Sequence, residues 1–178
     1  MIPILTPLNP SSHQFENEIA CIDIATVASR IVAAVGLWTV QTVLIIAIPT
    51  LEILSTQVIE SDYLIRSVLI TTFADGVTQL FAGLGDGALT SFIVDAPQAK
   101  IVAETSKTVT LGPRPIVMCG FEANGVVSIF VSSDRPTVIS RTSDKLVYSS
   151  VNLKVRPSRS SFRSLADSSA EHQCCRRL

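Results

Sequence analysis

The feature that most constrains the fold of this chain is an uncharged run over residues 31–51, bounded by Arg30 and Glu52. As a helix this run would be about 30 Å long, which matches the hydrocarbon core of a bilayer. Its apolar side chains would surround the whole helix, as in a membrane span or the central helix of a large core. We therefore predict a single transmembrane helix at residues 31–51, a membrane localisation, and the lipid bilayer as its partner. The amide of Gln41 would need a partner helix or an interfacial water.

The same run has a second interpretation. It is rich in β-branched residues, which suit buried strands as well as helices. A buried helix or a pair of buried strands therefore stays open as an alternative. A cleaved signal peptide is less well supported, because the apolar region begins only after residue 30.

Composition agrees with membrane contact. The mean hydropathy is +0.44, and only 16% of the residues are charged, against about a quarter in typical soluble domains. A net charge of −1 gives no electrostatic footprint for nucleic acid, so no specific nucleic-acid partner is predicted. The chain has 21 Ser but only 4 Lys, which would also fit a reading frame never selected as a protein.

The first half of the chain is predicted to be helical. Residues 1–18 contain three prolines and indicate an extended leader, and residues 19–95 form a helical region that includes the segment 31–51. Within it, Ile65, Leu69, Phe73 and Val77 recur at a spacing that predicts a second, amphipathic helix over residues 63–84. A second membrane span is disfavoured, because Asp75 would lie near the middle of the bilayer.

The second half is predicted to be β-rich over residues 101–156. Two β-prone runs, 116–121 and 126–131, flank Asn124-Gly125, a pair that readily forms a tight hairpin turn. Ser143-Asp144 marks a further hairpin, so a meander of about four antiparallel strands follows. Residues 157–178 are rich in Ser and Arg and indicate a disordered basic tail. The predicted fold class is therefore α+β.

Candidate sites for chemistry are few. The glycines of residues 83–87 resemble a phosphate loop only superficially, because they follow a helical pattern and no Lys-Ser/Thr comes next. We interpret them as loop residues that end the predicted helix. Asp75, Asp86 and Asp95 lack the alternating spacing of a calcium loop and are interpreted as solvated.

The remaining candidate ligands lie near the two ends of the chain. His13, His172, Cys174 and Cys175 could bind a soft metal, but two adjacent cysteines chelate one zinc ion poorly. The last four residues place Cys175 where prenylation needs a cysteine, but the next two positions are Arg instead of aliphatic residues. We therefore predict no catalytic, cofactor-binding or metal-binding residues and no cofactor.

Three functional hypotheses remain. The first is a small single-pass membrane protein without catalytic activity. The second is a soluble α+β interaction module, and the third is a translated open reading frame without selected function. None of them includes an enzyme, since two histidines near opposite ends of the chain offer a poor supply of general base.

Overall fold

The structure is a computed structural model that describes residues 17–151, all of whose regular elements are β-strands. The first sheet contains β1 (Ile19–Val27), β2 (Arg30–Leu37), β3 (Thr42–Ala47) and β4 (Ile53–Val58). The second contains β5 (Ile65–Thr72), β6 (Thr78–Leu84), β7 (Ala88–Asp95) and β8 (Lys100–Thr110). The third contains β9 (Val117–Ala123), β10 (Val126–Ser132), β11 (Thr137–Thr142) and β12 (Lys145–Ser150).

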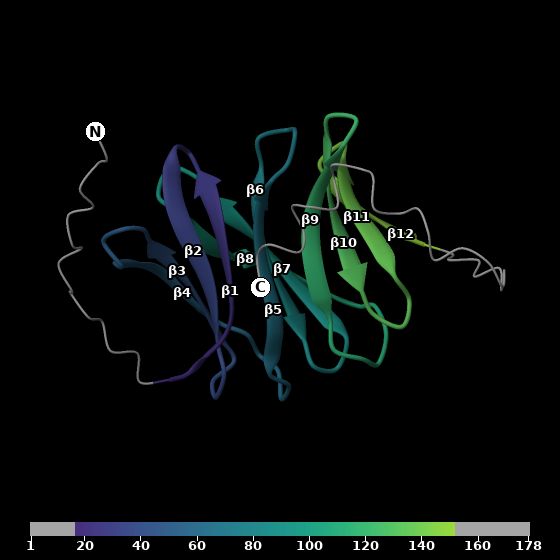
Figure 1. The fold of residues 1–178 in the computed structure, drawn as a ribbon, viewed down its shortest axis with the longest axis horizontal. Coiled ribbons are helices and arrows are strands. Elements are labelled where there is room, and N and C mark those ends of the chain that lie inside the picture. Colours follow the sequence, from purple (N-terminus) through teal and green to yellow (C-terminus); the bar gives the residue numbers. More distant parts are fainter. Residues whose placement is uncertain (1–16, 152–178) are drawn as a thin grey trace, which may run out of the picture.

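Each sheet is an antiparallel meander in which every strand pairs with its neighbours in the sequence. Figure 1 shows the three sheets side by side in chain order, with β1, β5 and β9 next to one another. The first strand of each sheet therefore lies at the inner edge. The second sheet is packed between the other two, which leaves the first and third sheets each with one face turned outward.

Tight turns close the hairpins where the sequence allows positive φ angles. Asn124 and Gly125 both have positive φ, as do Ser143 and Asp144. These are the two hairpins predicted from the sequence, and the predicted four-strand meander is confirmed as β9–β12. Ala28 and Ser29 adopt the same left-handed conformation between β1 and β2, although neither residue favours it.

Two apolar cores hold the sheets together. Between the first and second sheets, Val32 and Ile45 pack in one buried cluster with Leu80 and Phe92. Between the second and third sheets, a second cluster is built around Phe81 together with buried residues of the third sheet. Fully burying one such side chain contributes about 1.5–3 kcal/mol. Because β6 is buried along its whole length, its residues face both cores in alternation.

Hydrogen bonds also link the inner edges of the sheets. The backbone N–H of Ile70 on β5 donates to the Asp23 carboxylate on β1 at 2.9 Å. The Ser67 hydroxyl on β5 donates to the carbonyl of Ile116, just before β9, at 2.9 Å. These directional contacts fix how far neighbouring sheets are shifted along their strands, which non-directional apolar packing does not determine.

The predicted transmembrane helix at residues 31–51 is wrong. This segment forms most of β2, all of β3 and the turns after them, so the alternative of a buried strand pair is correct. No helix able to span a bilayer is found among residues 17–151. The membrane localisation and the bilayer as partner were predicted from a helix at residues 31–51, and they are also wrong because these residues form paired strands. Gln41 meets no partner helix, and its carbonyl in the β2–β3 turn accepts a hydrogen bond from the Ile59 N–H at 2.6 Å.

The predicted amphipathic helix at residues 63–84 is wrong as well, and with it the helical region 19–95 and the α+β class. Residues 65–84 form the β5–β6 hairpin, and Asp75 lies in its turn, where its carboxylate accepts from the Val77 N–H at 3.1 Å. Most of the predicted leader, 1–18, and the predicted tail, 157–178, lie outside the described residues.

Candidate functional site

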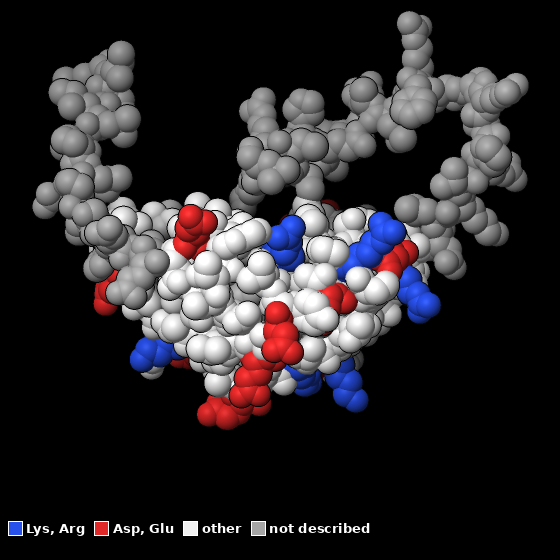
Figure 2. Space-filling model, turned by 90° about the horizontal axis from the view of Figure 1, so that it is seen from below, with Lys and Arg blue, Asp and Glu red and all other residues white. Residues whose placement is uncertain are grey.

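The candidate site lies at one end of the sheets, which we call the lower end after its place in Figure 1. Connections 38–41, 59–64, 85–87, 111–116 and 133–136 all gather there. Figure 2 looks onto this end and shows acidic and basic side chains interspersed on a largely uncharged surface. This face therefore offers no continuous basic strip of the kind that tracks a phosphate backbone.

An exposed aromatic and cationic cluster occupies the lower end of the first and second sheets. We call it the Trp38 patch, and it consists of Trp38, Tyr63 and Arg66. The guanidinium carbon of Arg66 lies 5.4 Å from the centroid of the Trp38 ring, a cation–π contact. Trp38 is 39% exposed and Tyr63 is 53% exposed. Each is of a residue type that is enriched among the energetic centres of protein interfaces.

The backbone holds this patch in place. The N–H of Trp38 donates to the Glu18 carbonyl at 2.6 Å, which anchors the β2–β3 turn beside β1. The side chains of Arg66 and Tyr63 both lie beside Gly85, where an added Cβ would come 3.9 Å from the Arg66 Cγ and 4.0 Å from the Tyr63 Cβ. Among the described residues, no carboxylate forms an ion pair with Arg66. Its guanidinium is thus available to a partner's carboxylate.

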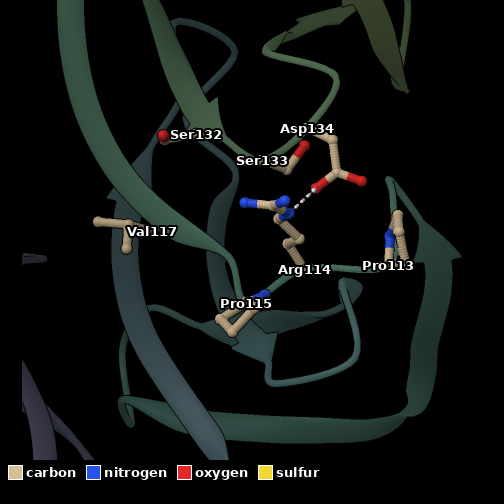
Figure 3. Close-up of a pocket in the computed structure, with 7 residues that line it drawn as sticks. All are labelled: Pro113, Arg114, Pro115, Val117, Ser132, Ser133 and Asp134. Carbon is tan, nitrogen blue, oxygen red and sulfur yellow. Dashed lines mark ion pairs between the residues drawn. The ribbon is translucent and has the colours of Figure 1, made fainter.

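A shallow groove lies at the lower end of the third sheet, lined by residues 113–115, Val117 and residues 132–134. Figure 3 shows the Arg114 guanidinium directed toward Asp134 across this groove. The Arg114 Nε lies 3.8 Å from the Asp134 carboxylate, and the Arg114 side chain is 80% exposed. Such a surface ion pair contributes at most about 1 kcal/mol.

The groove does not assemble a catalytic centre. The Ser133 hydroxyl donates to the Arg135 carbonyl at 3.0 Å and accepts from the Arg135 N–H at 3.2 Å, so it is engaged in its own turn. A nucleophilic serine would need a base within hydrogen-bond reach. Among residues 17–151 there is also no cluster of three or more His, Cys, Asp or Glu side chains that could hold a metal ion.

The candidate residues singled out from the sequence are spread over the fold. Gly85 and Gly87 lie in the turn between two strands, β6 and β7, an arrangement that does not present a helix N-terminus to a phosphate. Asp75 lies at the opposite end, where a hydrogen bond from the Arg141 side chain holds the pKa of its carboxyl below the usual value. Asp86 accepts from the Ala88 N–H at 3.0 Å in its own turn. His13, His172, Cys174 and Cys175 lie outside the described residues.

Titratable groups between the sheets are shifted by burial. Burial raises the pKa of the Cys21 thiol to about 11, and Cys21 faces the second sheet from β1. Burial also raises the pKa of Tyr148. Both groups stay neutral near pH 7, so neither supplies a reactive anion.

Twisted four-stranded antiparallel meanders, set side by side with their first strands at a common inner edge, are the blades of a β-propeller. The described residues form three such blades. Comparison with known proteins agrees. A family model described as the second β-propeller of RSE1, DDB1 and CPSF1 matches residues 6–170, and the chain belongs to this family.

Curated relatives resemble most of this chain. It is 40% identical over 145 residues to DNA damage-binding protein 1 of Oryza sativa subsp. japonica, covering 79% of this chain and 13% of the relative. It is 39% identical over 141 residues to DNA damage-binding protein 1 of Drosophila melanogaster, covering 77% of this chain and 12% of the relative. It is 36% identical over 143 residues to DNA damage-binding protein 1a of Arabidopsis thaliana, covering 78% and 13%. The chain thus spans about an eighth of the length of these relatives.

These findings decide between the three functional hypotheses. A single-pass membrane protein is wrong, and so is a reading frame without selection, because an unselected frame would not match a propeller family over residues 6–170. The interaction module is the hypothesis that the findings favour, although its α+β fold is wrong. Membership of a family defined by its propeller is also consistent with the expectation that the chain is not an enzyme.

Proposed function

We propose that this chain is a non-catalytic, protein-binding part of a β-propeller scaffold. The observation that carries the proposal is the Trp38 patch, which joins two exposed aromatic rings to an arginine that no described carboxylate neutralises. Loops displayed by a rigid scaffold are where binding residues concentrate, and three connections supply or support this patch.

The chemistry of the patch defines the kind of partner. Trp38 and Tyr63 offer apolar surface, and Arg66 offers up to five N–H donors in a plane suited to a carboxylate. A protein segment with an apolar side chain next to Asp or Glu would satisfy both. Burial of the cation–π pair on binding would strengthen it, from about 0.5–1 kcal/mol when exposed to about 2 kcal/mol when desolvated.

Site-specific photocrosslinking tests this proposal. A photoreactive phenylalanine analogue replaces Tyr63 in the full chain, and a second variant carries the same analogue at Asn124, in a turn at the opposite end of the third sheet. We expect a discrete crosslinked protein from position 63, weakened at least several-fold by Arg66→Ala and unchanged by Lys107→Ala, which removes an exposed cation elsewhere.

Two results would contradict the proposal. One is equal crosslinking from positions 63 and 124, which would mean nonspecific contact. The other concerns DNA, because the curated relatives are named as DNA damage-binding proteins. Tight binding of the chain to ultraviolet-damaged duplex, with a steep salt dependence, would assign it a nucleic-acid partner instead.

A further inference from the structure

The outer edge of β12 differs from the outer edges of the other two sheets. Natural proteins protect an edge strand against pairing with a further strand, and bulges are one common device. In β4 the pairing with β3 shifts at Leu54, which has no partner. In β8 residues 103–106 bulge out opposite Phe92, and the Thr105 hydroxyl accepts a hydrogen bond from the Ile93 N–H at 2.8 Å. By contrast, β12 pairs with β11 over six consecutive residues without a shift.

The regular pairing of β12 determines which of its backbone groups point away from the sheet. Just after β12, the Val151 N–H donates to the Pro136 carbonyl at 2.8 Å, toward the β11 side. Residues that bond inward and outward alternate along an antiparallel edge strand. Leu146, Tyr148 and Ser150 therefore direct both N–H and C=O outward. Among the described residues, none forms a hydrogen bond with these outward groups.

An open groove lies beside this edge. Where the first and second sheets meet, the Ser55 hydroxyl of β4 accepts a hydrogen bond from the Ile101 N–H of β8 at 3.1 Å, which covers part of the β8 edge. Where the second and third sheets meet, the space beside β12 is instead a groove of about 770 Å³, within the size range of natural ligand sites. Its lining consists of Asp86, residues 110–113, Asp134, Arg135, Thr137, Tyr148 and Ser150.

The charges in the groove favour a basic side chain. The Asp86 carboxylate accepts from the Ala88 N–H at 3.0 Å, and among the described residues it forms no ion pair. Asp134 faces Arg114 at 3.8 Å. Arg135 also lines the groove, but it is exposed and pairs with neither carboxylate. A Lys or Arg side chain that entered the groove would therefore meet an unpaired carboxylate.

We propose that the outer edge of β12 binds an extended segment of a partner protein, which adds one antiparallel strand to the third sheet. Residues directly opposite each other in an antiparallel pair have their side chains on the same face. Tyr148 and Ser150 line the groove, so residues opposite them would also turn toward it, and one of these would be Lys or Arg. Main-chain hydrogen bonds would supply affinity, and Asp86 would supply selectivity. This inference is independent of the function proposed for the Trp38 patch.

Backbone methylation of a peptide probe tests the added strand without changing the protein. The probe is a short fluorescent peptide of alternating Val and Thr with a central Lys, and fluorescence anisotropy measures its binding to the full chain. With the Lys in the groove, the N–H groups of the Lys and of the residues two positions away face β12. Methylating these nitrogens should weaken binding at least about tenfold, since hydrogen bonds are lost. Methylating the nitrogens of the two residues next to the Lys is the matched control and should change binding less than about twofold.

Two variants of the chain test the edge and the groove separately. Ser150→Pro removes an outward N–H and no hydrogen bond to β11, so it should weaken binding several-fold, while Ser150→Ala should not. Asp86→Asn keeps an acceptor for the Ala88 N–H but removes the charge. It should weaken binding of the Lys peptide several-fold and leave a matched peptide with Gln in place of Lys unaffected. Circular dichroism should show that each variant keeps its β structure.

Three results would overturn the proposal. The first is a probe that does not bind the wild-type chain at millimolar concentration. The second is an equal loss of binding for the two methylation patterns, because the backbone of the peptide would then not pair with β12. The third is slow amide hydrogen exchange at residues 146, 148 and 150 before any peptide is added, measured by NMR on the full chain, because the chain itself would then cover the edge.

Discussion

Gly87 is the residue at which a single added methyl group should be most damaging. It has a φ of +84°, and its carbonyl accepts a hydrogen bond from the Leu111 N–H at 2.9 Å. A Cβ built at this position would lie 1.9 Å from the Gly112 carbonyl oxygen and 2.9 Å from the Arg114 carbonyl oxygen. Gly87 therefore fastens the β6–β7 turn to the connection between the second and third sheets.

The expected cost of Gly87→Ala has two parts. A left-handed conformation costs a non-glycine residue about 1–2 kcal/mol. Displacing packed backbone to make room costs about 1–3 kcal/mol more. The sum, about 2–5 kcal/mol, is a large part of the 5–15 kcal/mol that is typical for a domain. At about 3 °C per kcal/mol for a chain of this size, the melting temperature should fall by roughly 6–15 °C.

Gly76→Ala is the matched control for this prediction. Gly76 has a φ of +81°, almost the same as Gly87, but a Cβ added there would meet nothing within 4 Å. It should lose only the conformational part, about 1–2 kcal/mol. Denaturant unfolding followed by circular dichroism, at one protein concentration, measures both variants. Equal losses for Gly87→Ala and Gly76→Ala would refute the close approach of the Gly112 backbone.

Three further predictions concern side chains between or beside the sheets. The hydrogen bond from Arg141 lowers the pKa of Asp75 from 3.8, so its stabilisation is present above about pH 4 and lost as the pH falls further. Asp75→Asn should therefore reduce the fall in the free energy of unfolding below about pH 4, as measured by denaturant unfolding at several pH values. The same fall in the variant and the wild type would contradict this prediction. Burial raises the pKa of Cys21 from 9.0 to about 11, which lowers the fraction of reactive thiolate at pH 8. Alkylation of Cys21, followed by peptide mass spectrometry, should therefore be about 100-fold slower in the folded chain than in urea. Equal alkylation rates would mean that the thiol is accessible in the folded chain. A Cβ at Gly36 would lie 2.7 Å from the Cys21 sulfur and 2.9 Å from an Ile65 methyl carbon, so Gly36→Ala should cost about 1–3 kcal/mol of unfolding free energy. Cys21→Ala added to that variant should recover part of the loss, and failure to do so would place the strain elsewhere.

The sequence predicted the third sheet well because its strands carry local turn signals. Asn124-Gly125 accepts the positive φ angles of a tight hairpin, and its flanking runs pair in the expected register. The first two sheets were misread because their central strands are buried on both faces. In β2 and β3 apolar residues occupy successive positions, so the alternation that marks a half-buried strand is missing. An apolar run without alternation looks the same in a helix surrounded by lipid and in a strand whose side chains are buried on both faces of its sheet.

The Trp38 patch could not be predicted from local patterns, since Arg66 reaches the Trp38 ring from a different sheet. Its location nevertheless follows from strand number. In a meander of four antiparallel strands, the connection between the second and third strands and the connection to the next sheet must lie at the same end. Residues 38–41, 59–64 and 85–87 are such connections, so counting strands correctly brings Trp38, Tyr63 and Gly85 together. One strand more or fewer in the first sheet would send Tyr63 and its loop to the opposite end. The position of the site therefore depends on the number and order of the strands. Its side chains are set by the sequences of surface loops, which packing in the two apolar cores does not constrain.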